Sequence, residues 1–465
     1  MMSSFESTTS KFLVRFSLLF FGLFLIQDLS HAQTIVFKDV NVLTMESDEI
    51  QSGYAVVVRD GIIEWVGVAA DVEVPEGVSV VGEGLYLMPG LAEMHAHIPP
   101  ASQGPDYVND VLKMYVSQGI TTIRGMLGEA SHLELREKAA RGEVVAPRIF
   151  TSGPSFNGNS AKDPEAAREM VRAQHAAGYD LLKLHPGLSV EVFDAIADEA
   201  NKLGMDFSGH ISHAVGLERT LASGKGTIDH LDRYMEFLAG DAALRQDPSI
   251  IFFGYDLTPH IDSDKMDEAA RRTLESGVRI VPTNTLLENV FNPDNTIAVM
   301  QTWPGMDLMP ANVKSGWINY ISILRNQDNY DADLSRQFLA YRLELTKTLH
   351  DNGVEILLGA DAPQIFNPPG YSAHKELELL VKAGLTPFEA ITTGTINVGK
   401  YFNETDKTGK VAPGYRADLI LLDVNPLESI PFNGHIRGVV ISGRFYNEQE
   451  ISAMTQQIRD RVSQE

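Results

Sequence analysis

Imidazole, amine and carboxylate side chains stand at the ends of short apolar runs in this chain of 465 residues. The residues concerned are His95, His97, Lys183, His210, His230 and Asp361. Their nitrogen and oxygen atoms could hold two divalent metal ions, and two adjacent metal ions suit hydrolysis. These residue types, in this order, predict a metal-dependent hydrolase.

The segment EMHAH places two imidazoles two positions apart. In an extended segment, His95 and His97 project from the same face of a strand and could grip one metal ion. Taken alone, such a pair is also typical of structural histidines. The ordered succession of all six residues is what favours a metal site.

Lys183 follows the apolar residues YDLL in a segment that we expect to be buried. Burial disfavours an ammonium ion and therefore lowers the pKa of the amine. The neutral amine can react with carbon dioxide, and the resulting anionic carbamate could bridge two cations. If Lys183 were the only clue, a lysine that is ion-paired or reaches the surface would be the simpler interpretation.

Strand-like runs alternate with helical patterns between residues 89 and 405. About eight such repeats over roughly 300 residues predict an α/β protein whose central domain is a (β/α)8 TIM-type barrel. A doubly wound open sheet is the competing fold. The candidate ligands favour the barrel because they end strand-like runs, and barrel active sites lie at the carboxyl ends of the strands.

Both ends of the chain carry β-branched, partly alternating runs with Gly-containing turns. We expect residues 33–88 and 406–449 to form one small β-sandwich domain, followed by a C-terminal helix over residues 450–465. The barrel would then occupy residues 89–405.

Residues 1–32 have the features of a secretory signal peptide. A basic flank with Lys11 and Arg15 precedes an apolar run over residues 16–26, and Ser30 and Ala32 suit cleavage before Gln33. An uncleaved anchor is the alternative, but the run is shorter than the roughly 20 residues that span a bilayer. We therefore expect an exported protein, periplasmic or extracellular, with no stable membrane span after removal of the leader.

Composition narrows the chemistry and the partners. The chain has no cysteine, so thiolate metal sites and disulfides are excluded. A net charge of −24 without a dense Lys/Arg cluster argues against a nucleic-acid partner. The acidity could attract a cationic substrate, although it also simply favours solubility. Neither charge nor composition indicates an oligomeric state.

Several segments together resemble the amidohydrolase superfamily. They are LMPGLAEMHAH, GITTIRG, YDLLKLH, ADLILLDVNPLESI and residues 369–402 followed by TGKVAPGYRADL. Within the superfamily, the chain is similar to the binuclear carboxylated-lysine branch of Xaa-Pro dipeptidases and ochratoxinase-like amidohydrolases. This resemblance implies a small-molecule substrate with a C–N amide bond, either a dipeptide or an N-acyl amino acid.

The resemblance also assigns roles to the candidate ligands. It implies that His95, His97 and Asp361 hold the more buried metal ion, and that His210 and His230 hold the more exposed one. Lys183, as its CO2-derived carbamate, and a hydroxide would bridge them. The hydroxide would attack the amide carbonyl. Asp361 would act as the catalytic general base and then as the acid that protonates the leaving amine. Zinc is the default for such ligands, although manganese, cobalt or iron suit them too.

Other residues remain candidates for substrate binding. Arg124, Arg233 and Tyr234 are placed where they could hold a substrate carboxylate, although each arginine could instead pair with a structural acid. Two further histidines lie near the predicted ligands. His213 rivals His210, and we expect it to be an outer or surface residue, while His185 is expected to serve the core or the surroundings of the site.

Long segments after His230 and after Asn284 carry aromatic residues. Trp303, Trp317 and Tyr320 could roof the site, although packing within a long insertion is the simpler interpretation.

Two other functions stay open. One is a cyclic-amide hydrolase or deaminase of the same superfamily, similar to imidazolonepropionase, which Lys183 argues against. The other is a non-catalytic exported binding protein.

Overall fold

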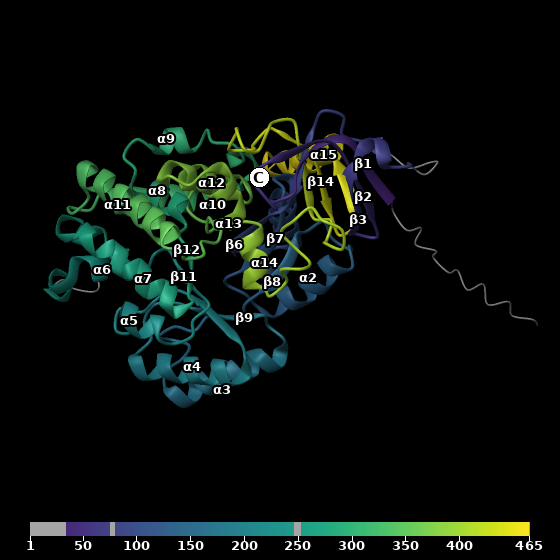
Figure 1. Cartoon of the computed structure of the whole chain (residues 1–465). Helices are drawn as coiled ribbons and strands as arrows, with labels where there is room; N and C mark the ends of the chain where they lie inside the picture. Colours follow the sequence, from purple (N-terminus) through teal and green to yellow (C-terminus); the bar gives the residue numbers. More distant parts are fainter. Residues whose placement is uncertain (1–33, 75–79, 246–252, 465) are drawn as a thin grey trace, which may run out of the picture. The chain divides into compact units, whose positions relative to one another are not determined.

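Strands from both ends of the chain pair in one sheet. The computed structural model describes residues 34–74, 80–245 and 253–464, so the predicted signal peptide lies outside the described residues. The sheet has the order β15-β14-β13-β5-β1-β2-β3, and β4 pairs with β1. Its strands are β1 (Thr34–Leu43), β2 (Ile50–Arg59), β3 (Ile62–Val68), β4 (Val80–Val81), β5 (Tyr86–Pro89), β13 (Leu419–Leu422), β14 (Ile436–Ile441) and β15 (Arg444–Asn447). Figure 1 shows β1, β2, β3 and β14 in the same region of the molecule.

The junction of the two chain ends lies inside this sheet. β13 pairs antiparallel with β5 and places Leu419 opposite Pro89 and Leu421 opposite Leu87. All four residues of β13 are buried, as is typical of a strand covered on both faces. The predicted domain limits at residues 88 and 405 stay predictions.

Seven further strands form two parallel sheets. One has the order β6-β7-β8 and the other β12-β11-β10-β9. The strands are β6 (Leu91–Ala96), β7 (Ile120–Gly125), β8 (Arg148–Thr151), β9 (Leu181–Leu184), β10 (Asp206–Gly209), β11 (Thr227–Asp229) and β12 (Arg279–Val281). Every residue of β6, β7 and β9 is buried, as expected for parallel strands covered on both faces. The predicted α/β class with parallel strands is confirmed.

Isolated parallel bridges connect these sheets to each other. The bridged pairs are Ser152 with Leu181, Phe156 with Leu184, Ile280 with Ile356, and Ala96 with Ala362. The pairing therefore passes from β8 to β9 and from β12 to the segment over residues 356–362. That segment in turn pairs with β6.

Helices occupy most of the connections between the parallel strands. They are α1 (Pro105–Ser117), α2 (Ala130–Ala140), α3 (Pro164–Ala177), α4 (Val190–Leu203), α5 (Gly216–Leu221), α6 (Tyr234–Ala239), α7 (Met266–Ser276), α8 (Asn284–Phe291), α9 (Ile297–Met300), α10 (Ala311–Arg325), α11 (Ala332–Asp351), α12 (Tyr371–Ala383), α13 (Pro387–Thr393), α14 (Ile396–Tyr401) and α15 (Glu448–Val462). Short 3-10 helices are η1 (Ala69–Asp71), η2 (Ala101–Gln103), η3 (Gly240–Arg245), η4 (Tyr255–His260), η5 (Ser263–Lys265) and η6 (Met306–Leu308).

Local sequence signals determine where the helices begin and end. Asp163 caps the first turn of α3 by accepting from Ala166 N, and Ser189 caps α4 in the same way through Val192 N. Gly178 and Gly204 end these helices in the left-handed conformation. The two helices thereby frame β9, the strand that carries Lys183.

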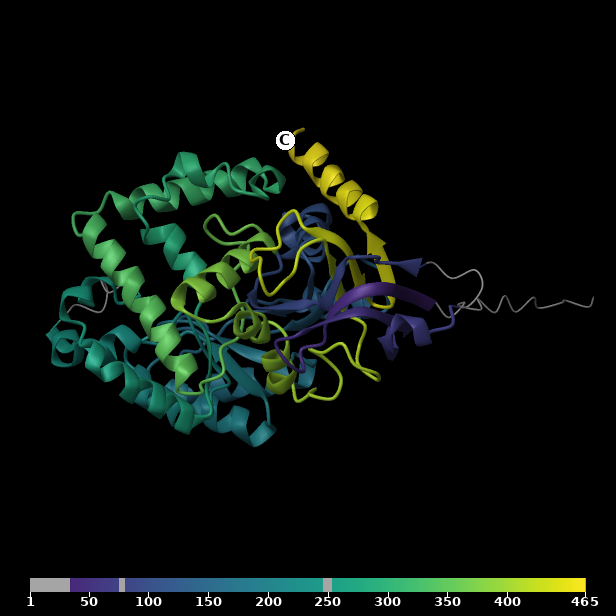
Figure 2. The same cartoon turned by 45° about the horizontal axis from the view of Figure 1, so that its top comes forward.

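The last helix follows the sheet of the chain ends. Figure 2 shows α15, in yellow, beyond the last strands of that sheet. Arg461 on α15 pairs with Asp110 on α1 at 2.8 Å. No helix in the described part of the chain is both long and apolar enough to cross a membrane.

Candidate metal centre

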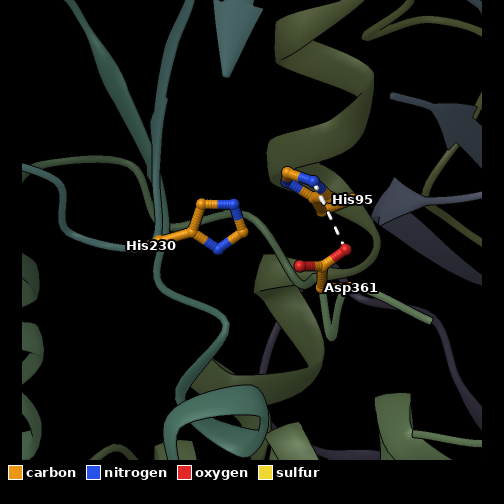
Figure 3. Close-up of side chains that lie close together, drawn as sticks. All are labelled: His95, His230 and Asp361. Atoms are coloured by element: carbon orange, nitrogen blue, oxygen red, sulfur yellow. Dashed lines mark ion pairs between the residues drawn. The ribbon is translucent and has the colours of Figure 1, made fainter. Parts of the chain in front are cut away.

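The ends of the parallel strands bring the candidate ligands together. His95 lies in β6, Lys183 in β9, and His210 and His230 directly follow β10 and β11. Asp361 lies near the end of the segment over residues 356–362, which pairs with β6, and its N–H donates to His95 O at 3.0 Å. Ligand atoms of His95, His230 and Asp361 lie within 4.8 Å of one another, and all three residues are buried. Figure 3 shows the three side chains facing one another.

Asp361 and Lys183 connect the two histidines of EMHAH to the rest of the group. Asp361 Oδ1 lies 2.6 Å from His97 Nε2 and 3.6 Å from His95 Nε2. The Lys183 Nζ is 3.1 Å from His95 Nε2. The carboxylate of Asp361 thus lies near both imidazoles, and the amine of Lys183 contacts that of His95.

His230 links this pair to His210. Its ring centroid lies 4.5 Å from that of His95 and 4.5 Å from that of His210. His230 Nδ1 lies 2.7 Å from Thr283 Oγ1, which can accept a hydrogen bond from Nδ1. The other ring nitrogen, Nε2, is buried and has no hydrogen-bond partner among the described residues. A buried ring nitrogen without a hydrogen-bond partner is free to bind a metal ion through its lone pair when the other ring nitrogen carries the proton.

The backbone at these residues is unusual. His230 and Asp361 both have φ of 63°, and Thr283 has φ of 47°, although none is glycine. Side chains rarely adopt this left-handed region, and such strain collects at functional sites. The main-chain carbonyl of His230 accepts from Arg342 Nη1 at 2.9 Å, which helps to fix this turn.

Burial and neighbouring charges set the protonation of the site. Burial and then the Lys183 charge lower the pKa of His95 to about 4, so this imidazole is neutral at neutral pH. Burial likewise lowers the pKa of Lys183. Burial would raise the pKa of the Asp361 carboxyl, but the imidazoles of His95 and His97 hold it well below its usual range. Neutral imidazoles and an ionised carboxylate are the forms that ligate metal ions.

Three residues that orient the imidazoles were not foreseen from the sequence. Asp229 Oδ2 lies 2.6 Å from His95 Nδ1, and Asp232 Oδ2 lies 2.9 Å from His210 Nδ1. Thr283 holds His230 in the same way. Carboxylates and hydroxyls in these positions fix the tautomer of a ligating histidine. Asp229 and Asp232 flank His230 in TIDHLD, and this spacing was the available signal.

The structure does not fit the expectation that Arg124 binds a substrate carboxylate. Its side chain is fully buried, and its five N–H groups have five partners in the protein. These partners are Met94 O, Ser208 Oγ, Tyr401 Oη, Thr227 Oγ1 and Asp229 Oδ2. Arg124 therefore supports Asp229, which in turn contacts His95.

Tyr234 is also directed elsewhere. It is fully buried at the start of α6, and its hydroxyl lies 2.6 Å from Thr273 Oγ1 on α7. The expectation that it binds substrate does not fit this position. Arg233 contacts Glu236 and lies 3.5 Å from His213 Nδ1, with 12% of its side chain exposed. Its role toward a substrate stays a prediction.

The remaining candidates divide between the site and the periphery. The ring of His185 lies beside that of His210 at a centroid distance of 5.2 Å and is tilted by 34° to it, whereas His213 is exposed. Trp317 packs against Phe366 at 5.7 Å. Trp303 lies under the ammonium group of Lys375.

The residues present fit a metal ion. Three buried ligand atoms converge, the Nε2 of His230 lacks a hydrogen-bond partner among the described residues, and the carboxylates of Asp229 and Asp232 contact the imidazoles of His95 and His210. All donors are nitrogen or oxygen, as a hydrolytic metal site requires.

Comparisons with known proteins agree with this chemistry. The family model of the amidohydrolase family matches residues 86–446. The ochratoxinase of Aspergillus niger is 23% identical over 417 residues, covering 81% of this chain and 78% of the relative. An imidazolonepropionase of Kosmotoga olearia is 22% identical and covers 83% of this chain and 88% of the relative. The crystal structure of a candidate prolidase of Bifidobacterium longum matches with a TM-score of 0.65 and 23% identity, over 92% of this chain and 99% of that one.

The α/β fold and the His/Asp site define a hydrolase that acts on C–N bonds. The chain belongs to the amidohydrolase family, as its match over most of its length shows. The superfamily predicted from the sequence and the expectation of an enzyme are confirmed. The reading as a non-catalytic binding protein is accordingly set aside.

Proposed function

We propose that this protein is a metal-dependent hydrolase that cleaves the amide C–N bond of a dipeptide or an N-acyl amino acid. One observation carries the proposal: the buried, unpartnered Nε2 of His230 faces His95 and Asp361 at the ends of parallel strands. The named relatives, an ochratoxinase and a candidate prolidase, support this substrate class.

We further infer that the parallel sheets close into a (β/α)8 barrel. The bridge between Ser152 and Leu181 joins the two sheets on one side. The bridges of residues 356–362 to Ile280 and Ala96 join them on the other. This succession of pairings supports a closed barrel over an open doubly wound sheet, in which two edge strands would stay unpaired.

Six residues are the proposed ligands of two divalent ions. His95, His97 and Asp361 would hold one ion, and His210 and His230 the other. Lys183, as its carbamate, would serve both, and zinc is the expected metal. The buried amine of Lys183, with its lowered pKa, is the form that reacts with carbon dioxide. When bound, the ions supply a nucleophile from water near neutral pH and polarise the carbonyl.

Asp361 is the proposed proton carrier. Its carboxylate is ionised, lies among the ligands and has 11% of its side chain exposed, so it can meet both water and substrate. It would accept the proton of the attacking water and donate it to the departing amine. The short contact to His97 holds this carboxylate in place.

Cyclic-amide hydrolysis is the second candidate. The similarity to an imidazolonepropionase favours it. The buried Lys183, 3.1 Å from His95 Nε2, instead supports a two-metal site, because its carbamate would bridge two ions and a one-metal site needs no bridging ligand.

Amine release from a substrate panel tests the proposal. The mature protein would be supplied with zinc and bicarbonate and offered Xaa-Pro dipeptides, other dipeptides, N-acyl amino acids and cyclic amides. We expect release from the first three classes and its loss in Lys183→Ala, while Lys202→Ala, which removes an exposed lysine, keeps it. Turnover of cyclic amides alone would favour the second candidate, and full turnover by Lys183→Ala would contradict the two-metal site.

Export remains part of the proposal. The features of residues 1–32 support a cleaved leader and a periplasmic or extracellular location. Sequencing the N-terminus of the secreted protein would test this, because cleavage predicts a start at Gln33.

A further inference from the structure

A cavity of about 420 Å³ lies beside helix α12, apart from the proposed metal centre. It is lined by Trp303 and Pro304, by one face of α12 with Tyr371 and Lys375, and by the loop that ends at Asn433. None of the six proposed metal ligands lines it. Its volume is within the range of sites for small molecules.

A cation with unused bonding capacity lies on one wall of this cavity. The Lys375 Nζ lies 3.5 Å from the ring centroid of Trp303 and donates to Asn289 Oδ1 at 2.7 Å. Among the described residues Lys375 forms no ion pair, although the nearby carboxylates of Glu288, Glu378 and Glu376 favour its charged form. An ammonium group has three N–H donors, so one stays available to a ligand. Burial lowers the pKa of Lys375 to about 8, and a bound anion would reverse part of that effect.

Hydrogen-bond acceptors and carboxylates also line the cavity, besides the ammonium group of Lys375. Asn433 Oδ1 is buried and has no hydrogen-bond partner in the part of the chain that the structure describes. The carboxylate of Glu378 also lines the cavity. Glu288 lines it too, but Lys382 lies 3.7 Å from its carboxylate. An unpartnered acceptor and a carboxylate in the same lining both suit a cationic N–H group.

The rest of the wall is partly polar, with Asn295, Asn367, Ser372 and Lys382, and partly apolar. Pro304, Phe366 and Leu379 line it, and Phe366 and Leu379 belong to the hydrophobic core. A ligand with a carboxylate, an ammonium group and an apolar body would match Lys375, Asn433 and the apolar part of this wall.

We propose that this cavity binds a free zwitterionic amino acid with an apolar side chain, its carboxylate on Lys375 and its ammonium group on Asn433 Oδ1. The cavity is separate from the metal centre. The connection between them passes through Asn289, whose Nδ2 donates to Asn367 Oδ1 at 2.7 Å, and through Asn367, which donates to Ala360 O at 2.6 Å. The proposal does not depend on which amide bond the enzyme cleaves.

Equilibrium dialysis of radiolabelled L-leucine against the zinc-loaded full chain tests the proposal. We expect one saturable site per chain. Lys375→Met should weaken it at least about tenfold, since a charge-assisted hydrogen bond is lost. Lys347→Met, which removes a lysine paired with Asp351 on α11, should leave binding unchanged. Asn433→Leu is a second variant that removes only the acceptor, and it should weaken binding as well.

Two analogues separate the contributions of the ligand groups. 4-Methylpentanoate lacks the ammonium group and 3-methylbutylamine lacks the carboxylate, so both should bind more weakly than L-leucine. No saturable binding up to about 10 mM would overturn the proposal. Loss of binding in Lys183→Ala with full binding in Lys375→Met would also overturn it, because the amino acid would then occupy the metal centre. Turnover is not measured, so failure here is distinguishable from failure of the proposed hydrolysis.

Discussion

Asp229 Oδ2 lies 2.6 Å from Nδ1 of His95, and both side chains are buried. This contact leaves Nε2 of His95 directed toward Asp361 and Lys183. A carboxylate that accepts a hydrogen bond from a ligating imidazole fixes the tautomer of the imidazole and makes its other ring nitrogen a stronger metal ligand. The contact between Asp229 and His95 therefore orients His95 for the proposed metal site.

Replacing this carboxylate should weaken metal binding. In Asp229→Asn, the amide cannot stabilise the donor form of Nδ1 equally well, so we expect zinc affinity to fall about 10- to 100-fold. Competition with a chromophoric chelator measures it. Asp198→Asn removes an exposed carboxylate and serves as the control. Unchanged affinity in Asp229→Asn would show that the contact does not tune the ligand.

Loss of Arg124 should affect stability rather than substrate affinity. Arg124→Met removes five hydrogen bonds and leaves the buried Asp229 without its cation, which costs about 3 to 5 kcal/mol of unfolding free energy. Urea denaturation measures this. If Arg124 instead held a substrate carboxylate, the variant would keep its stability and only KM would rise. That result would restore the role predicted from the sequence.

Gly209 leaves room for Lys183. A Cβ at residue 209 would lie 2.7 Å from Leu184 O and 2.8 Å from Lys183 Cδ, and φ is +102°. Gly209→Ala should therefore displace the lysine and lower turnover and Tm together. Gly204→Ala is the matched control, because φ there is +65° but no atom lies within 4 Å. It should lower stability by about 1 to 2 kcal/mol and leave turnover intact. Equal turnover in the two variants would contradict the steric argument.

Glu376 should make stability depend on pH. Its buried carboxyl accepts from the N–H groups of Asn284 and Thr285, and burial raises its pKa from 4.5 to about 7. A raised folded-state pKa contributes stability that is fully present below about pH 4.5 and is lost as pH rises through about 7. Between pH 5 and 8 this loss amounts to as much as about 3 kcal/mol.

The Glu376→Gln variant isolates that contribution. Its unfolding free energy, measured by urea denaturation at several pH values, should fall less between pH 5 and 8 than that of the parent. Glu344→Gln on the exposed side of α11 should follow the parent curve. Identical slopes for the parent and Glu376→Gln would contradict the raised pKa.

The sequence allowed the strand ends to be predicted, because apolar runs that stop at a polar residue are visible in one dimension. Lys183 after YDLL and Asp361 after VEILLGA are examples, and the structure places both beside His95. The directions of neighbouring side chains were not predictable in this way. Arg124 ends a strand-like run and Tyr234 follows soon after His230, yet Arg124 supports Asp229 and Tyr234 packs toward α7.

Contacts between segments that are distant in the sequence could not be predicted from it either. The contact of Asp232 with His210 spans 22 residues and that of Thr283 with His230 spans 53. Their partners are set by which strands are neighbours in the sheet. The same holds for Lys375 and Trp303, whose cation–π contact depends on how α12 packs against a long connection. A single sequence gives no measure of such packing.

Reversible removal of metal tests whether the proposed metal centre carries the hydrolysis. The mature protein would be dialysed against a chelator, its zinc content measured, and its release of amine from the panel followed before and after zinc and bicarbonate are restored. We expect two zinc ions per chain, loss of amine release when the metal is removed, and recovery of amine release when zinc and bicarbonate are restored. Amine release that persists in the metal-free protein would contradict metal-dependent hydrolysis.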